Sequence, residues 1–95
     1  MSSERYELTV ARPARRALTT ELPFKIASAA WELIDGMLRD NPRRAGKPLQ
    51  GQFEGQWVAP RSTYRIRYRI DDDKHTLIVL DIAGRADAYR RNRAH

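Results

Sequence analysis

Apolar and basic residues alternate without a break between residues 64 and 70. The segment reads Tyr64, Arg65, Ile66, Arg67, Tyr68, Arg69 and Ile70. This period of two is typical of a strand with one buried and one exposed face. An acidic cluster at 71–73 interrupts it, and residues 76–83 then form a nearly unbroken apolar run, typical of a central strand covered on both faces. The two segments together predict an antiparallel hairpin.

The predicted hairpin has a geometric consequence for its basic end. Antiparallel pairing places the start of the first strand beside the end of the second. Arg61 and Arg65 are therefore expected to lie near Gly84 and Arg85, and Tyr89 follows a few residues later. Three guanidinium groups and a phenol are thus predicted to converge at one end of a sheet.

The segments before the hairpin predict a strand and a helical pair. Residues 5–11 alternate and indicate a first strand, and residues 14–18 indicate a short helix, followed by a turn at 19–21. Residues 24–40 repeat apolar positions at i, i+3, i+4 and i+7, which predicts an amphipathic helix ended by the Asn-Pro pair at 41–42.

The remaining segments complete an α+β, two-layer fold. Residues 43–51 are expected to form a basic loop and residues 52–59 a strand. The three later strands would form one antiparallel meander, covered on one face by the helices and open on the other, where Arg67 and Arg69 would lie. Residues 86–95 form a basic tail, expected to be one turn of helix or flexible.

Composition limits the class of protein. The 95 residues predict a single domain, 1–95, with one core. The sequence has no cysteine, and it shows neither a hydrophobic signal core nor an apolar run of about 18 residues, so a cytoplasmic protein is expected. The net charge of +6 lies wholly in residues 43–95, which favours nucleic acid or an acidic protein as the partner.

The titratable residues exclude most catalytic chemistries. His75 and His95 have no neighbours at metal-ligand spacing, Ser62 has no histidine to activate it, and no phosphate-binding glycine loop is present, so no cofactor is expected. Arginines, Lys47 and tyrosines remain. Such residues bind phosphate and stabilise a pentacovalent phosphate, but arginine transfers protons poorly. The residues alone therefore predict a phosphodiester-binding surface that is incompletely equipped for cleavage.

Four motifs follow one another along the chain: the loop R-A-G-K-P-L at 44–49, F-E-G-Q-W at 53–57, Y-R-I-R-Y at 64–68 and R-A-D-A-Y-R at 85–90. In this order they resemble the RelE/ParE toxin superfamily, and mycobacterial RelE-type toxins in particular. The resemblance covers essentially the whole chain. It implies a toxin of a type II toxin–antitoxin system that cuts mRNA in the ribosomal A site without a metal, by attack of the ribose 2′-OH on the adjacent phosphate.

The resemblance also implies roles for single residues. Arg65 matches the family arginine that contacts the scissile phosphate, and Arg85 the one implicated in phosphate stabilisation and leaving-group protonation. Tyr89 matches a tyrosine that orients a base. The contacts with RNA and ribosome would be made by further basic residues: Arg43, Arg44, Lys47, Arg61, Arg90 and Arg91.

Two departures leave other functions open. Lysines of the second strand in some members correspond to Gln56 and Val58, and a histidine before the last arginine corresponds to Gly84. The general base is therefore unassigned, and Lys47 and the ribosome are the two candidates for it. A gyrase inhibitor of the ParE type and a catalytically weak toxin that serves as a co-repressor are the alternatives. A purely structural alternative for Arg65 is an ion pair with Asp81.

The resemblance implies a partner for each of these functions. A cognate antitoxin, acidic and partly disordered, would wrap the toxin and screen its arginines, and the complex would contact operator DNA mainly through the antitoxin. The mRNA and the A-site rRNA would be the targets.

Overall fold

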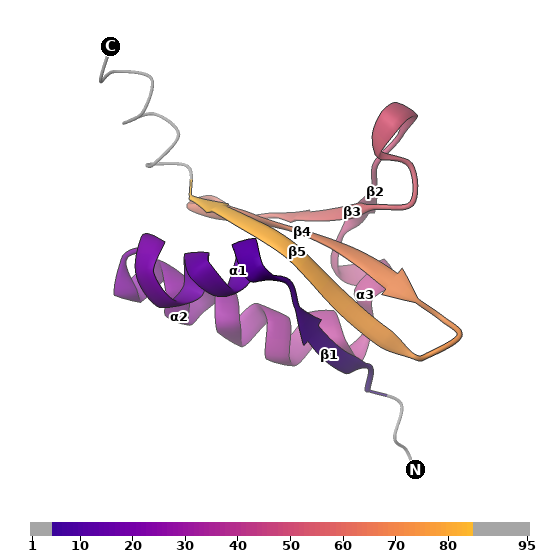
Figure 1. Cartoon of the computed structure of the whole chain (residues 1–95), viewed down its shortest axis with the longest axis horizontal. Coiled ribbons are helices and arrows are strands. Elements are labelled where there is room, and N and C mark those ends of the chain that lie inside the picture. Colours follow the sequence, from indigo (N-terminus) through magenta and orange to yellow (C-terminus); the bar gives the residue numbers. More distant parts are fainter. Residues whose placement is uncertain (1–4, 85–95) are drawn as a thin grey trace.

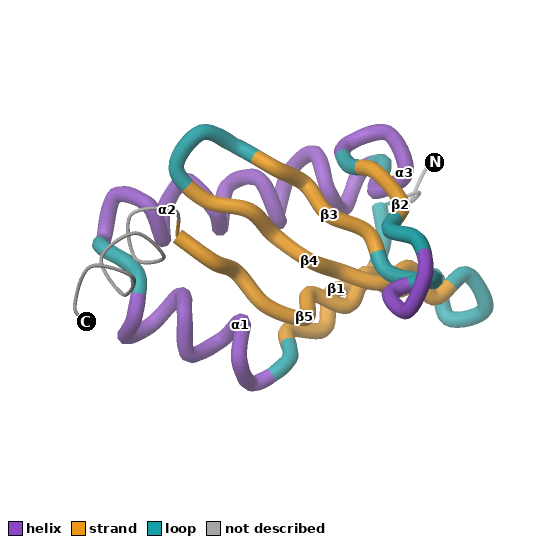
Figure 2. Tube along the Cα trace, turned by 90° about the horizontal axis from the view of Figure 1, so that it is seen from above, coloured by secondary structure: helices purple, strands orange, loops and turns teal. Residues whose placement is uncertain are grey.

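A computed structural model describes residues 5–84 as a sheet packed on helices (Figure 1). The sheet contains five strands: β1 Glu7–Val10, β2 Lys47–Pro48, β3 Trp57–Pro60, β4 Tyr64–Asp71 and β5 Thr76–Gly84. The helical segments are α1 Arg12–Arg16, η1 Ala17–Glu21, α2 Phe24–Leu33, η2 Ile34–Leu38, α3 Pro42–Ala45 and η3 Gly51–Phe53. The helices α1 and α2 both lie on the same face of the sheet (Figure 1), and Figure 2 shows the strands from above, which confirms the predicted α+β two-layer class.

The hairpin of β4 and β5 is confirmed with a defined register. Tyr64 lies opposite Gly84, and Asp71 lies opposite Thr76 at the other end. The register shifts between Arg67 and Tyr68, which marks a local irregularity of the ladder. β3 pairs antiparallel with β4, so the three-stranded meander is confirmed as well.

The strand order β1-β5-β4-β3-β2 places β5 between two other strands. β1 pairs with β5 in parallel, which the long connection through the helices allows. The predicted cover on both faces of β5 is wrong, however. Leu77 and Val79 are buried on the helical side, whereas Ile78 and Leu80 are only half-buried and Ala83 is exposed.

The core lies between the helices and one face of the sheet. Ile66 and Tyr68 from β4 and Leu77 and Val79 from β5 are fully buried, as is Ile34 from the helical layer. Each of these strands places alternate residues on this face, as the period of two requires. The alternation in β4 therefore follows directly from which face the helices cover.

The turn predicted at residues 19–21 is wrong, because the chain there continues α1 as the π-type segment η1. The hydroxyls of Thr19 and Thr20 donate to the carbonyls of Arg15 and Arg16 at 2.9 Å, so both threonines bond back onto the helix. Such back-bonding lets threonine stay within a helix rather than end it.

The loop predicted at 43–51 is also wrong in part, because it contains α3 and the short edge strand β2. Asn41 caps α3 by accepting a hydrogen bond from the Arg44 amide at 3.3 Å, and Pro42 occupies its first turn. The Asn-Pro pair thus ends one helix and starts another.

The strand predicted at 52–59 is shorter than expected, since it begins only at Trp57. Gly51 and Gly55 have φ values of 66° and 96°, in a region that favours glycine. These two residues let η3 and the following turn leave the plane of the sheet, which sequence alternation alone did not show.

Candidate functional site

The open face of β4 carries Arg65, which is predicted to bind the scissile phosphate, together with Arg67 and Arg69. Arg65 and Arg69 are exposed, whereas Arg67 is half-buried. Arg65 lies opposite Pro60 on β3 and Ala83 on β5, so its predicted position beside the end of β5 is confirmed. This end of β5 leads directly into Arg85.

Arg61 occupies the turn between β3 and β4. Its backbone amide donates to the Tyr64 carbonyl at 2.8 Å, and its guanidinium donates to the Pro60 carbonyl at 2.6 Å. The turn therefore holds Arg61 just before the start of β4, at the same end of the hairpin as Arg65. On the core side of β4, burial raises the pKa of Tyr64, and the positive charge of Arg61 partly opposes that shift.

Arg67, rather than Arg65, forms the ion pair with Asp81, so the structural alternative for Arg65 is wrong. The register places Arg67 directly opposite Asp81, and a guanidinium nitrogen contacts the carboxylate. Arg67 also donates to the Gln56 Oε1 at 3.2 Å. Within residues 5–84, no hydrogen bond or ion pair links the Arg65 side chain to another residue. Arg65 is therefore available for an external anion.

A groove of about 510 Å³ lies along the open face of the sheet beside Arg65 and Arg67. Its lining includes Leu49, Phe53, Val58, Arg65, Arg67 and Asp81. The first three residues form an apolar wall that comes from the segment between β2 and β3 and from β3 itself. The groove thus combines an apolar side with a cation that has no anionic partner in the described chain.

Phe53, Gln56 and Asp81 are members of this site that sequence reasoning missed as functional. Asp81 was visible as the single acidic residue in the apolar run of β5. Phe53 was expected on a regular strand, and its position at the groove depends on the turn at Gly51 and Gly55, which carries no pattern that alternation detects.

The other predicted basic residues are not gathered in the groove. Arg43 forms a two-pronged contact with Asp72, at 3.2 and 2.7 Å, at the opposite end of the β4–β5 hairpin. This hydrogen bond raises the pKa of Arg43 and lowers the pKa of Asp72. Arg44 is exposed on α3, and Lys47 is exposed on the edge strand β2, opposite Val58. Arg85, Tyr89, Arg90 and Arg91, and the predicted tail at 86–95, lie outside the described residues.

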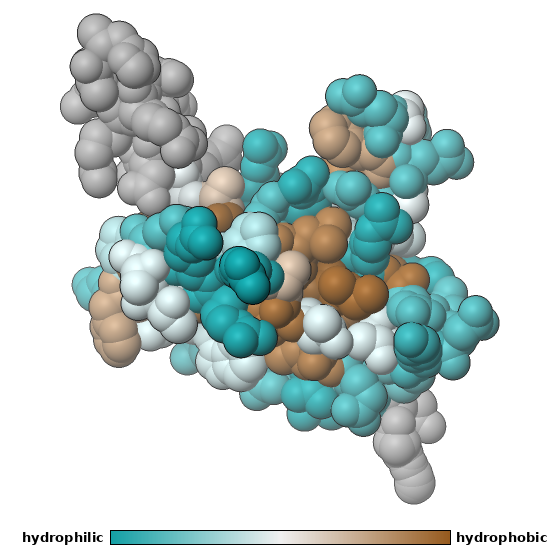
Figure 3. Space-filling view, viewed as in Figure 1, coloured by the Kyte–Doolittle hydropathy of each residue, from teal (hydrophilic) through white to brown (hydrophobic). Residues whose placement is uncertain are grey.

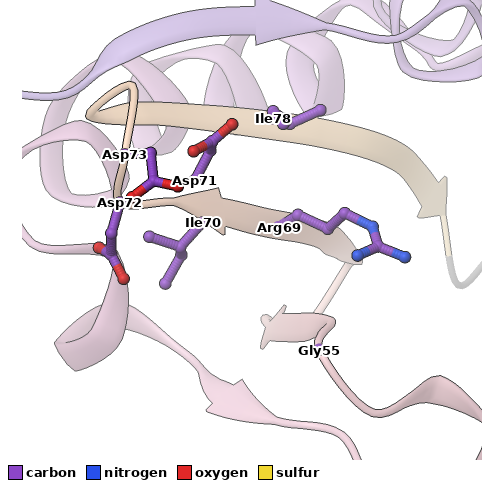
Figure 4. Close-up of a pocket in the computed structure, with 7 residues that line it drawn as sticks. All are labelled: Gly55, Arg69, Ile70, Asp71, Asp72, Asp73 and Ile78. Carbon is purple, nitrogen blue, oxygen red and sulfur yellow. The ribbon is translucent and has the colours of Figure 1, made fainter.

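The acidic turn forms a separate pocket of about 430 Å³ (Figure 4). Arg69 points along the sheet away from the carboxylates, and Asp71 and Asp72 already accept hydrogen bonds from the Lys74 amide and from Arg43. Asp71 therefore helps to close the turn, and Asp72 is used in the ion pair with Arg43. Among the residues that the structure describes, no group of three histidines or carboxylates is placed to hold a metal ion. In the same range, no helix is long and apolar enough to cross a membrane.

The sequence and the fold match a known class of protein. The model for "ParE toxin of type II toxin-antitoxin system" matches residues 25–89. The sequence is 42% identical to Toxin RelE of Mycobacterium tuberculosis over 87 residues, which cover 92% of this chain and 89% of the relative. It is 43% identical to Toxin RelG of the same organism over 86 residues, covering 90% and 98%.

The solved structures agree with the sequence comparisons. The toxin–antitoxin complex RelBE2 from Mycobacterium tuberculosis contains a chain with a TM-score of 0.81 and 40% identity, covering 85% of this chain and 99% of that one. The isolated RelE toxin of E. coli, at 17% identity, shares the fold with a TM-score of 0.67, covering 95% and 99%.

These similarities define a small toxin with the RelE-like α+β fold. The chain belongs to the ParE toxin family of type II toxin–antitoxin systems. The resemblance expected from the four sequence motifs is thereby confirmed.

Proposed function

We propose that this toxin is a ribosome-dependent endoribonuclease that cuts mRNA in the A site and so inhibits translation in the cytoplasm. The observation that carries the proposal is the state of Arg65. It is exposed beside the end of β5, and it has no carboxylate partner within residues 5–84. A guanidinium in this state can bind a phosphate with two parallel hydrogen bonds.

The proposed reaction is attack of a ribose 2′-OH on the adjacent phosphorus, which leaves a 2′,3′-cyclic phosphate. Arg65 would neutralise charge on the pentacovalent phosphate, which is where such donors contribute most to rate. Arg85, the first residue after β5, would assist the departing 5′ oxygen, and Tyr89 would orient a base. These last two roles rest on the family motif, and the reaction needs no resident metal.

Further basic residues are proposed to contact RNA around this centre. Arg61 lies at the same end of the hairpin, and Lys47 and Arg44 are exposed nearer β2 and α3. Arg43 would have to release Asp72 before it could contact phosphate. Arg90 and Arg91 are assigned on charge alone.

A gyrase inhibitor is the second candidate, and the acid–base inventory favours it. Gln56 uses its amide oxygen to hold Arg67, and Val58 lines the groove as an apolar residue. Neither supplies a proton-transfer group where some relatives carry lysine. A toxin that binds but does not cut would then act on a protein target, or mainly as a co-repressor with its antitoxin.

We infer that the partner is an acidic, partly disordered antitoxin that wraps the toxin. One observation in support is an apolar surface on the face opposite the groove, where Phe24 is 84% exposed and Trp31 is 42% exposed. Leu18 and Val10 extend it towards β1, whose outer edge is free in the described sheet. Figure 3 shows apolar residues gathered over β1 and the adjoining part of β5. The RelBE2 complex of Mycobacterium tuberculosis pairs a relative with an antitoxin, and operator DNA would be contacted through such a partner.

The proposed function is tested by primer extension on an mRNA in a translating extract. The purified toxin should produce cuts at A-site codons that require ribosomes, and Arg85→Ala should abolish them. A folded preparation that produces no ribosome-dependent cuts would overturn the nuclease proposal. Inhibition of gyrase supercoiling by the same preparation would then identify the second candidate.

A further inference from the structure

Phe53 is an exposed aromatic residue in an unusual place. Among residues 5–84, the large apolar side chains with high exposure are Phe24, Trp31, Met37 and Phe53. The first three belong to the helical layer, but Phe53 ends η3 and lines the groove on the open side of the sheet. It is 41% exposed, so part of its ring is available to a ligand.

The Phe53 ring lies beside a charged network. The Cζ of Arg67 lies 5.9 Å from the ring centroid, within the range of a cation–π contact. Arg67 is fixed in turn by Asp81 on β5 and by Gln56, which follows Phe53 in the same turn. Phe53 therefore has a fixed charged neighbour, and its exposed part remains accessible to a planar ligand.

The groove presents two different chemistries side by side. Phe53, Leu49 and Val58 form an apolar wall, and Arg65 supplies a positive charge that no described carboxylate neutralises. Asp81 neutralises Arg67, so the net attraction for an anion is concentrated at Arg65. A nucleotide joins a flat aromatic base to a phosphate, and this combination matches the groove better than an acidic side chain would.

We propose that Phe53 is a stacking platform for one base of single-stranded RNA whose phosphate binds Arg65. The inference rests on the proposed function and adds the subsite that holds the RNA. Asp81 and Gln56 act as positioning residues, because both hold the Arg67 side chain that lies beside the Phe53 ring. Stacking on an aromatic side chain tolerates any base, so this subsite gives affinity without a sequence preference.

The test is a binding cycle between a side chain and a base. A fluorescent single-stranded RNA oligonucleotide with 2′-O-methyl groups, which lacks the attacking hydroxyl, is titrated with the toxin and followed by anisotropy. A set of the same oligonucleotides, each abasic at one position, is measured in parallel. Phe53→Ala is compared with wild type, and Phe24→Ala serves as the matched control because it removes an exposed phenylalanine on the helical layer.

The expected result is a coupling between Phe53 and one position of the RNA. Removing that base should weaken binding to wild type and to Phe24→Ala by about 5-fold to 150-fold, the range for one stacked base. Phe53→Ala should bind the intact oligonucleotide equally weakly and should not distinguish it from the abasic one. Phe53→Tyr, which keeps the ring, should restore the discrimination, and Phe53→Leu should not.

Three results would overturn the inference. They are no binding of the oligonucleotide by wild type, an equal abasic penalty in wild type and Phe53→Ala, and a loss confined to antitoxin binding. The outcome is separate from that of the nuclease proposal. If coupling is found but no ribosome-dependent cuts, the stacking site is supported and the nuclease proposal is overturned. If Phe53→Ala cuts mRNA as well as wild type and no coupling is found, the nuclease proposal is supported and the stacking site is overturned.

Discussion

The two faces of β4 differ more than any other two regions of the molecule. Ile66 and Tyr68 face the helices and are completely buried, while Arg65 and Arg69 face outward and are exposed. The same seven-residue alternation thus serves the core on one side and a cationic surface on the other. Substitutions in β4 should therefore fall into two groups: those on the buried face alter stability, and those on the outward face alter ligand binding.

Arg67 lies between these two extremes. It belongs to the outward face, but its contacts with Asp81, Gln56 and Phe53 are all internal. The three arginines on this face therefore differ in their surroundings. Arg67 is tied to its neighbours by these contacts, whereas Arg65 and Arg69 are exposed.

The largest expected effect on stability comes from the buried face. Ile66→Ala should lower the free energy of unfolding by about 2–5 kcal/mol, because it removes apolar contacts and leaves a cavity. Arg69→Ala, on the outward face of the same strand, should change it by no more than about 0.5 kcal/mol. Urea unfolding followed by circular dichroism measures both. Equal losses in the two variants would contradict the division between the faces.

A smaller effect is expected where two layers approach closely. A Cβ at Gly46 would lie 2.5 Å from the Val58 carbonyl oxygen and would also collide with the Tyr68 hydroxyl. Gly46→Ala should therefore cost about 2–3 kcal/mol through overpacking. Gly36→Ala is the control, since no atom lies within 4 Å of its added Cβ, and it should stabilise the helix by up to about 1 kcal/mol. Opposite shifts in the thermal midpoint are the predicted result.

The hydroxyl of Tyr68 should make the buried face sensitive to alkali. It donates to the Pro42 carbonyl at 2.6 Å, and burial raises the pKa of Tyr68 to about 12. Because the pKa is raised on folding, the Tyr68 hydroxyl contributes fully to the free energy of unfolding below the ordinary pKa near 10. This contribution is lost as the pH rises from about 10 to about 12. Tyr68→Phe should cost about 1–2 kcal/mol at neutral pH, because it leaves the carbonyl unpaired.

The pH dependence of this variant provides the decisive comparison. Between pH 10 and 12 the difference in unfolding free energy between wild type and Tyr68→Phe should shrink, as the wild type loses its Tyr68 contribution. Denaturant unfolding at a series of alkaline pH values measures this difference. A difference that stays constant over that range would show that Tyr68 does not titrate as its burial requires.

The smallest expected effect lies at the exposed end of the hairpin. The hydrogen bond from Arg43 lowers the pKa of Asp72, so its contribution is present above the ordinary value near 4 and disappears as pH falls through the lowered one. Asp72→Asn should remove this part of the dependence of the unfolding free energy on acidic pH. It should leave the groove at the other end of the hairpin unchanged at neutral pH. NMR titration of the Asp72 carboxyl carbon tests it, with Arg43→Ala expected to return the pKa to its usual range.

Much of the fold was accessible from periodicity. The alternation in β4 and the apolar run of β5 predicted the hairpin and, within a residue or two of register, the position of Arg65 beside the end of β5, because antiparallel pairing fixes which strand ends meet. The long amphipathic segment gave the helical layer for a similar reason. Family motifs, rather than periodicity, gave the toxin class.

The missed features depend on single residues and long-range contacts. Gly51 and Gly55 adopt positive φ and redirect the chain. Part of the expected strand is therefore η3 and a turn, and this turn places Phe53 at the groove. Asp81 forms its ion pair with Arg67 and not with Arg65 because the register places Arg67 directly opposite it. Sequence spacing could not fix this register to the residue. The threonines of η1 kept a helix where composition favoured a turn.

Arg65, on the outward face of β4, is proposed to bind the phosphate that is cut. The most direct measurement is primer extension in a translating extract with Arg65→Ala, with Arg69→Ala as the matched control on the same face and thermal unfolding of both variants. Loss of a preorganised charge donor should lower ribosome-dependent cleavage by about 100-fold to 1,000-fold, with little change in unfolding temperature. Wild-type cleavage by Arg65→Ala, or an equal loss in Arg69→Ala, would contradict the account.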